Sequence, residues 1–152
     1  MRICAITRNV AVGWALLLGL GMGLATPAQA EHMRRLGDWE VHYVVIPTLF
    51  LKAEIAADYG LTRGRDRGLL NISVLDRDGR PVRAQVEGTV TNLLGQQQAL
   101  AFREVREGEA VYYLALVRHT DQEVLRFAVT LVPPDETRQR LEFQQMLYWE
   151  NP

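Results

Sequence analysis

The feature that most constrains the fold of this chain is an alternation of apolar and polar side chains with a period of two residues. It is clearest over residues 82–90, where polar residues separate Val82, Ala84, Val86, Gly88 and Val90. Successive side chains of a β-strand point to opposite faces of a sheet, so this pattern predicts a strand with one buried face. Comparable strand-like segments recur at residues 38–46, 69–75, 99–105, 110–117, 123–131 and 141–149. We therefore expect about seven strands.

The connections between these segments carry residues that favour turns. Asp78-Gly79 is a pair that tolerates positive φ, and Pro133-Pro134 cannot donate hydrogen bonds to a sheet. Many short strands separated by such turns predict an all-β, immunoglobulin-like antiparallel β-sandwich, with a small barrel as the alternative. The segment 110–117 lacks alternating polar residues, which predicts a strand in the middle of a sheet, covered on both faces.

One segment after the first predicted strand departs from the alternation. Residues 50–60 are rich in helix-forming side chains, and Leu51, Ile55 and Tyr59 recur every four residues along one stripe. Gly60 is suited to the left-handed conformation that ends many helices. We expect one short helix here that packs this stripe on a sheet, because two turns of helix are unstable alone.

The first thirty residues have the pattern of a cleavable signal peptide. Arg2 and Arg8 give a positive start, residues 10–24 are apolar, and Ala28-Gln29-Ala30 is a small-x-small cleavage site. The apolar run is shorter than the roughly 20 residues of a membrane span, although an uncleaved anchor is the alternative. We expect residues 1–30 to be removed and residues 31–152 to form a single domain, periplasmic or secreted, with no membrane span after cleavage.

Composition excludes two classes of function. Cys4 is the only cysteine and lies in the predicted signal peptide, so the mature chain offers neither disulfides nor thiol chemistry. All 18 acidic residues but only 15 of the 17 basic ones follow residue 30, which makes the mature chain mildly acidic. Nucleic-acid-binding proteins usually carry a basic balance, so we expect no nucleic-acid partner.

Residues typical of catalysis or metal binding are scarce. Ser73, the only serine, lies in the middle of a predicted strand and not on a nucleophile turn. His32, His42 and His119 are not spaced as a ligand pair, and the Asp76–Asp78 stretch lacks the downstream ligands of a calcium loop. We expect no catalytic residue, no metal and no cofactor.

The strongest candidate for a binding site is a group of arginines ahead of the strand 69–75. Arg63, Arg65 and Arg67 alternate in sequence and would point the same way if the segment were extended. Guanidinium groups bind carboxylates and phosphates, whereas the alternative is a solvated loop or ordinary surface salt bridges. With Asn71 and Asn92, these arginines form the candidate binding set. The C-terminal Tyr148 and Trp149 add aromatic surface if they are exposed.

Several short pieces of the chain resemble an exported proteobacterial family that is catalogued only as a domain of unknown function. The similar pieces are Phe50-Leu51, Glu54-Ile55-Ala56, Tyr59-Gly60, Arg63, Leu70-Asn71-Ile72-Ser73-Val74, Gly88-Thr89, Thr91-Asn92-Leu93-Leu94-Gly95 and Tyr112-Tyr113. The resemblance implies a single-domain periplasmic protein and supplies no activity.

These observations favour a periplasmic, non-enzymatic binding or assembly module whose partner is an envelope protein or an anionic ligand. One alternative is an envelope enzyme of hydrolase type whose site is assembled only in three dimensions. A second is a carrier of a small ligand, for which an apolar cavity inside the sandwich would be diagnostic.

Overall fold

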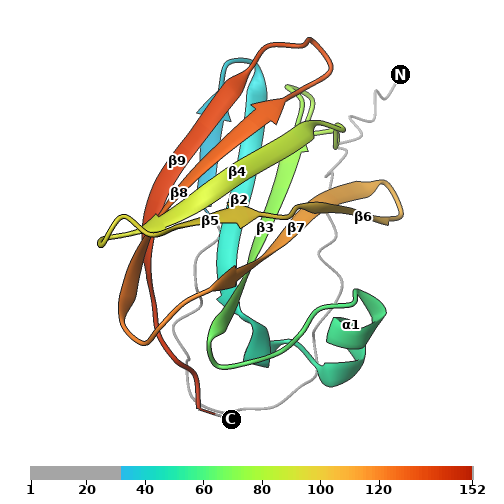
Figure 1. Ribbon diagram of the computed structural model, residues 1–152. Coiled ribbons are helices and arrows are strands. Elements are labelled where there is room, and N and C mark those ends of the chain that lie inside the picture. Colours follow the sequence, from blue (N-terminus) through green and yellow to red (C-terminus); the bar gives the residue numbers. More distant parts are fainter. Residues whose placement is uncertain (1–31, 152) are drawn as a thin grey trace, which may run out of the picture.

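The computed structural model describes residues 32–151, so the predicted signal peptide lies outside the described residues. Two antiparallel sheets pack face to face, with strand orders β1-β2-β3-β7-β6 and β5-β4-β8-β9 (Figure 1). The elements are β1 (His32–Leu36), β2 (Trp39–Pro47), η1 (Thr48–Phe50), α1 (Ala53–Asp58), β3 (Arg67–Leu75), β4 (Gln85–Asn92), β5 (Gln97–Leu100), β6 (Arg103–Glu107), β7 (Ala110–Arg118), β8 (Glu123–Val132) and β9 (Gln139–Leu147). The predicted antiparallel β-sandwich is confirmed.

Two strands are additional to the seven expected from the sequence. β1 has no apolar alternation, and it forms because its backbone pairs with β2 from His32 opposite Tyr43 to Leu36 opposite Trp39. The predicted strand 99–105 divides at Ala101-Phe102, so that β5 joins one sheet and β6 joins the other. Both differences arise from backbone pairing between segments, which side-chain patterning does not record.

The core lies between the inward faces of the two sheets, as the alternation predicts. Val45, Leu70, Val117, Val129 and Leu141 are all completely buried. An aromatic column crosses the core: the ring of Phe143 on β9 lies 4.5 Å from that of Tyr43 on β2 and 4.5 Å from that of Phe127 on β8. β7 lies between β3 and β6, which confirms its predicted place inside a sheet.

The turn at residues 76–80 forms where the sequence predicts it. Gly79 has φ +75°, and the side-chain oxygen Oδ1 of Asp76 accepts hydrogen bonds from the backbone N–H groups of Asp78 and Arg80, each at 2.9 Å. The chain then crosses to the other sheet, where β4 begins at Gln85. The hydroxyl of Tyr113 accepts a hydrogen bond from the N–H of Ala84 at 2.7 Å and holds this crossing.

The predicted short helix is present as α1, but its packing face differs from the predicted one. Gly60 has φ +61°, and the N–H groups of Gly60 and Leu61 bond the carbonyls of Ala57 and Ala56 in a Schellman motif. The expected stripe through Leu51 and Ile55 is wrong: Leu51 precedes the helix and Ile55 is 41% exposed. The helix buries the small Ala56 instead, so that a short helix can lie close to the rest of the protein.

Among the described residues, no helix has the length and hydrophobicity needed to cross a membrane.

Candidate functional site

The two ends of the sandwich differ in chemistry. The pairing of Pro47 with Gly68, Arg67 with Arg118, Asn92 with Leu125 and Glu123 with Leu147 brings one set of strand ends together. We define the loop end as residues 48–66, 93–96, 119–122 and 148–151, which connect or follow these strand ends. α1 and the chain that follows β9 are both in the lower part of Figure 1. The opposite end, with the turns that follow β1, β3 and β8, is the charged end.

The loop end carries most of the exposed apolar surface. Of the eight large hydrophobic side chains that are exposed among residues 32–151, six belong to it: Phe50, Ile55, Leu93, Leu94, Tyr148 and Trp149. Of the other two, Met146 is the second-last residue of β9, next to the loop end. Met33 on β1 is the one exposed hydrophobic side chain of this group that lies away from the loop end. Leu94 is 85% exposed and Phe50 62%. The expected aromatic surface at Tyr148 and Trp149 is therefore present.

A buried hydroxyl holds the loop that carries the arginines. The Oγ1 of Thr48, which is completely buried, accepts a hydrogen bond from the N–H of Gly64 at 3.0 Å. The same oxygen lies 3.0 Å from the carbonyl oxygens of Gly64 and Arg67, to which its proton is donated. One side chain thus satisfies three backbone groups that no strand pairs, and it fixes where the loop enters β3.

The three arginines do not point the same way, because a turn at Arg65-Asp66 interrupts the extended segment that the sequence suggests. The N–H of Arg67 bonds the carbonyl of Gly64 at 3.2 Å to close this turn. Arg63 donates to the carbonyl of Leu49 at 3.1 Å, and the guanidinium of Arg65 lies 4.3 Å from the ring centroid of Trp149. The C-terminal segment, the arginine loop and η1 therefore form one continuous surface.

Arg67 instead faces an arginine that sequence reasoning missed. Arg67 on β3 and Arg118 on β7 are directly opposite each other, and cross-strand partners project from the same face of a sheet. Arg118 ends an apolar strand that is far away in the sequence. The sequence shows only that Arg118 is a charged residue directly after the apolar run 110–117, and this does not indicate that it pairs with Arg67.

Asn71 and Asn92 lie in different sheets, and Asn92 lines a cavity together with Arg118. Asn71 follows Arg67 by four residues on the same outward face of β3, and its side-chain oxygen Oδ1 is buried without a hydrogen-bond partner. Asn92 lies in the other sheet and holds the β4–β5 turn: its Oδ1 accepts from the N–H groups of Leu94 and Gln96, and its Nδ2 donates to Glu123. The five residues of the candidate set thus occupy several places.

A cavity of about 270 Å³ beside the loop end contains a histidine near a carboxylate. The Nδ1 of His119 lies 2.9 Å from the carbonyl oxygen of Thr120. Glu123 accepts hydrogen bonds from the N–H of Thr120 at 2.7 Å and from Asn92 at 2.9 Å. Burial alone would raise the pKa of Glu123, but these hydrogen bonds outweigh it and lower the pKa. Both carboxylate oxygens are therefore occupied in joining the β4–β5 and β7–β8 turns.

The lowered pKa of Glu123 predicts a loss of stability in acid. Its folded-state pKa lies below the ordinary value of 4.5, so its contribution is complete above that pH and is lost as the pH falls through the lower, folded-state value. We expect Glu123→Gln to reduce the pH dependence of the urea midpoint between neutral pH and about pH 3. The control Glu109→Gln changes an exposed carboxylate in another turn. An equal effect of the two substitutions would contradict this role for Glu123.

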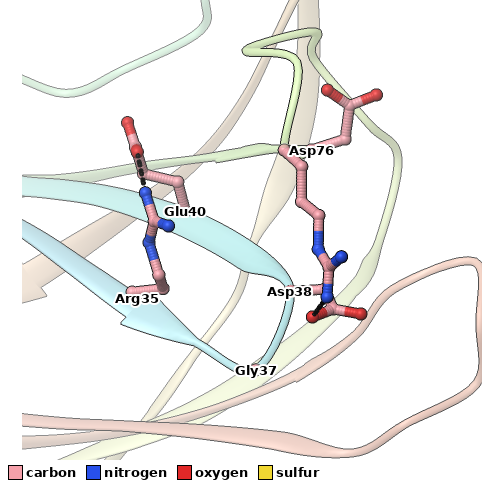
Figure 2. Close-up of a pocket in the computed structure, with 6 residues that line it drawn as sticks. Arg35, Gly37, Asp38, Glu40 and Asp76 are labelled. Carbon is pink, nitrogen blue, oxygen red and sulfur yellow. Dashed lines mark hydrogen bonds and ion pairs between the residues drawn. The ribbon is translucent and has the colours of Figure 1, made fainter.

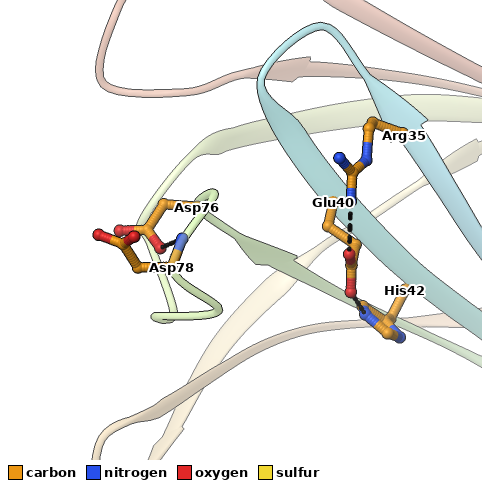
Figure 3. Close-up of polar contacts among 5 residues, drawn as sticks. All are labelled: Arg35, Glu40, His42, Asp76 and Asp78. Carbon is orange, nitrogen blue, oxygen red and sulfur yellow. Dashed lines mark hydrogen bonds and ion pairs between the residues drawn. The ribbon is translucent and has the colours of Figure 1, made fainter.

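At the charged end, ion pairs line a cavity of about 390 Å³ (Figure 2). Arg35 pairs with Glu40 at 3.4 Å, and Arg77 pairs with Asp38. Figure 3 shows that Glu40 also meets the Nε2 of His42, at 2.7 Å, and that Asp76 accepts the N–H of Asp78. The hydrogen bond with His42 lowers the pKa of Glu40, with a smaller effect from Arg35. The charges of this cavity largely neutralise one another.

Three of the four edge strands carry charges that disfavour pairing with another chain, and the fourth, β5, has only four residues. β1, β6, β5 and β9 are the edges of the two sheets. Arg34 and Arg35 lie on β1, β6 reads REVRE, and Arg140 and Glu142 lie on β9. Charged side chains on an edge oppose strand addition.

No three histidine, cysteine, aspartate or glutamate side chains gather as a potential metal site anywhere in residues 32–151.

Comparison with known proteins places this chain in a family. Residues 33–150 match the family described as Domain of unknown function (DUF4426). The chain belongs to the DUF4426 family. A crystal structure of a DUF4426 family protein from Pseudomonas aeruginosa PAO1 is 32% identical, with a TM-score of 0.74 over 82% of this chain and 99% of that one. The resemblance to a proteobacterial family of unknown function is thereby confirmed.

More distant solved structures share the fold of this DUF4426 chain. FetP of uropathogenic E. coli, expressed in the periplasm of E. coli, is 11% identical, with a TM-score of 0.61 over 80% of this chain and 96% of FetP. A copper-bound FetP variant, also 11% identical, gives a TM-score of 0.57 over 78% and 95%. At this identity the likeness concerns the fold alone. None of the curated proteins matches the chain.

Proposed function

We propose that this DUF4426 protein is a non-enzymatic binding module of the periplasm that contacts its partner through the loop end. The observation that carries the proposal is the concentration of exposed apolar side chains there, with Phe50, Leu94 and Trp149 on three different segments. Contiguous exposed apolar surface marks interaction sites, and aromatic and arginine side chains are enriched in them. The signal-peptide pattern of residues 1–30 supports the location.

The remaining surface is less suited to a stable contact. Edge strands β1, β6 and β9 carry charges that oppose strand addition, and the uncharged edge strand β5 is only four residues long. The ion pairs of the charged end are solvated, with the side chains of Arg77 and Asp38 72% and 58% exposed, and such pairs contribute little to binding or stability. The loop end is thus the favoured contact surface.

The alternatives of an enzyme and a carrier find less support. Both cavities described above are lined mainly by polar and charged side chains, and neither matches the apolar interior cavity of a carrier. Glu123 beside His119 has both oxygens engaged by Asn92 and Thr120, so neither is directed at a substrate. We do not propose copper binding for this chain by analogy with the FetP variant, because no three histidine, cysteine, aspartate or glutamate side chains gather as a potential metal site within residues 32–151.

Photo-crosslinking in intact cells would test the loop end as the contact surface. A photoreactive phenylalanine analogue would replace Phe50 or Leu94, which are both exposed at this end, or Met33 as the control. Met33 is 53% exposed and lies on β1, away from the loop end. We expect positions 50 and 94 to yield an adduct of the same mass and position 33 to yield none. A matching adduct from position 33, or no adduct from 50 and 94, would contradict the proposal.

A further inference from the structure

Two arginines on the strand ends next to the loop end lie opposite each other with little to neutralise them. Arg67 and Arg118 are cross-strand partners, so their Cβ atoms are about 4.5–5.5 Å apart, and like charges in this arrangement destabilise a sheet. The nearest acid to Arg67 is Asp66, whose Oδ1 lies 3.6 Å from Nε, and the Asp66 side chain is 46% exposed. No described carboxylate forms an ion pair with Arg118.

Several other arginines of this protein form ion pairs with acids. Arg83 and Arg106 share Glu104, Arg140 pairs with Glu142, and Arg35 pairs with Glu40. Arg67 and Arg118 differ from these, because they lie directly opposite each other and no described acid pairs with both.

The Nε of Arg67 is buried and has no hydrogen-bond partner. The great majority of buried polar groups in folded proteins form hydrogen bonds. A bound water or ion is one explanation for a group that has no partner in the protein. A charged donor left without an acceptor costs more than a neutral one. The Arg67 side chain as a whole is 26% exposed, although its Nε is not.

The position of Arg67 is set by its surroundings. A Cβ on Gly64 would lie 3.5 Å from the Cδ and 3.6 Å from the Nε of Arg67, so the side chain lies across this glycine. Thr48 bonds the carbonyl of Arg67 and both backbone groups of Gly64. Because the backbone on both sides of the guanidinium is already ordered, a ligand would not have to order it.

We propose that Arg67 and Arg118 form an oxyanion-binding site that takes a phosphate or carboxylate group. A guanidinium presents N–H donors in a planar fork that fits both groups, and an anion between two forks would remove the repulsion between them. This site goes beyond the proposed docking role, because a small anion can occupy it whether or not a partner protein binds the loop end.

The first test is a titration of the purified protein with sodium phosphate, with sodium chloride holding the ionic strength constant. The ¹⁵N–¹H resonance of the Arg67 Nε reports occupancy directly. We expect this resonance to shift with added phosphate until the shift saturates. We expect Arg67→Gln and Arg118→Gln each to weaken phosphate binding about tenfold or more. Because Arg67→Gln has no Nε resonance at position 67, its binding is measured by the shift of its melting temperature. Arg106→Gln removes one charge from a paired arginine and should leave binding unchanged.

A second arm uses acetate in place of phosphate. Saturable binding of either anion that depends on both arginines supports the proposal, and the tighter of the two identifies the group. A response to phosphate and acetate no larger than that to chloride would overturn it, as would equal affinity in Arg118→Gln and the unaltered protein.

Thermal melting separates this site from a structural role of Arg118. In chloride, Arg118→Gln should melt at the same temperature as the unaltered protein or higher, because a like-charge contact is removed. In phosphate, the unaltered protein should gain more stability than Arg118→Gln, because it binds the anion more tightly. A lower melting temperature in chloride together with an unchanged gain in phosphate would overturn the proposal.

Discussion

Replacing Phe127 with alanine is expected to lower the free energy of unfolding by about 3–5 kcal/mol, the largest effect of any substitution considered for this protein. Phe127 is 2% exposed, and its ring stacks on that of Phe143 at 4.5 Å with an interplanar angle of 4°. Phe143 in turn contacts Tyr43 of the opposite sheet. The substitution therefore leaves a cavity inside the column that joins the two sheets. Urea unfolding monitored by circular dichroism would measure the change.

The matched control is Phe50→Ala, which removes the same atoms from a side chain that is 62% exposed. We expect it to change the free energy of unfolding by no more than about 0.5 kcal/mol. The loss of Phe50 should instead weaken contact with a partner at the loop end. Similar losses of stability in the two variants would contradict the assignment of Phe127 to the core and Phe50 to the contact surface.

Replacing Thr48 with valine is expected to lower the free energy of unfolding by about 1–3 kcal/mol, although valine has nearly the same shape. The change removes the hydroxyl that accepts from the N–H of Gly64 and donates toward the carbonyls of Gly64 and Arg67. The N–H of Gly64 and the carbonyl of Arg67 would lose this partner at a partly buried site, while the carbonyl of Gly64 would keep its bond from the N–H of Arg67. We also expect faster hydrogen exchange at Gly64, because the loop loses its attachment to η1. Urea unfolding and amide exchange measure the two effects.

Thr62→Val provides the control for this prediction, since Thr62 is an exposed residue of the same loop. We expect the control to alter neither the urea midpoint nor the exchange of Gly64. An unchanged exchange rate at Gly64 in Thr48→Val would show that the loop is held by other contacts. The substitution should also weaken phosphate binding at Arg67 and Arg118, because the loop would no longer be ordered before the anion arrives.

Sequence patterning was reliable where one residue and its neighbours decide the structure. The alternation over 82–90 correctly predicts which residues of β4 face the core, and Gly60 and Gly79 adopt the positive φ expected of them. The packing face of α1 was wrongly predicted, because in so short a helix the surrounding structure decides which residue is buried. Ala56 is buried and Ile55 is exposed, although the latter is the more hydrophobic.

The candidate site was predictable only in part. The arginine-rich segment was identified, but the turn at Arg65-Asp66 and the attachment to Thr48 separate its side chains. Leu93 and Leu94 offered a signal that was not used: two apolar residues in a predicted turn have no core to enter. Arg118 could not be associated with Arg67, because only the pairing of β3 with β7 makes them neighbours.

The sequence by itself determined that the chain forms short strands with one apolar face, connected by turns at glycine, proline and aspartate, because these properties depend on each side chain and its immediate neighbours. Only the tertiary structure decided which strands pair, that β1 forms at all, and that the exposed apolar residues and the pair Arg67 and Arg118 meet at one end. The physical reason is that strand pairing is made by backbone hydrogen bonds between segments that are distant in the sequence, and the alternation within one segment does not say which other segment supplies these bonds.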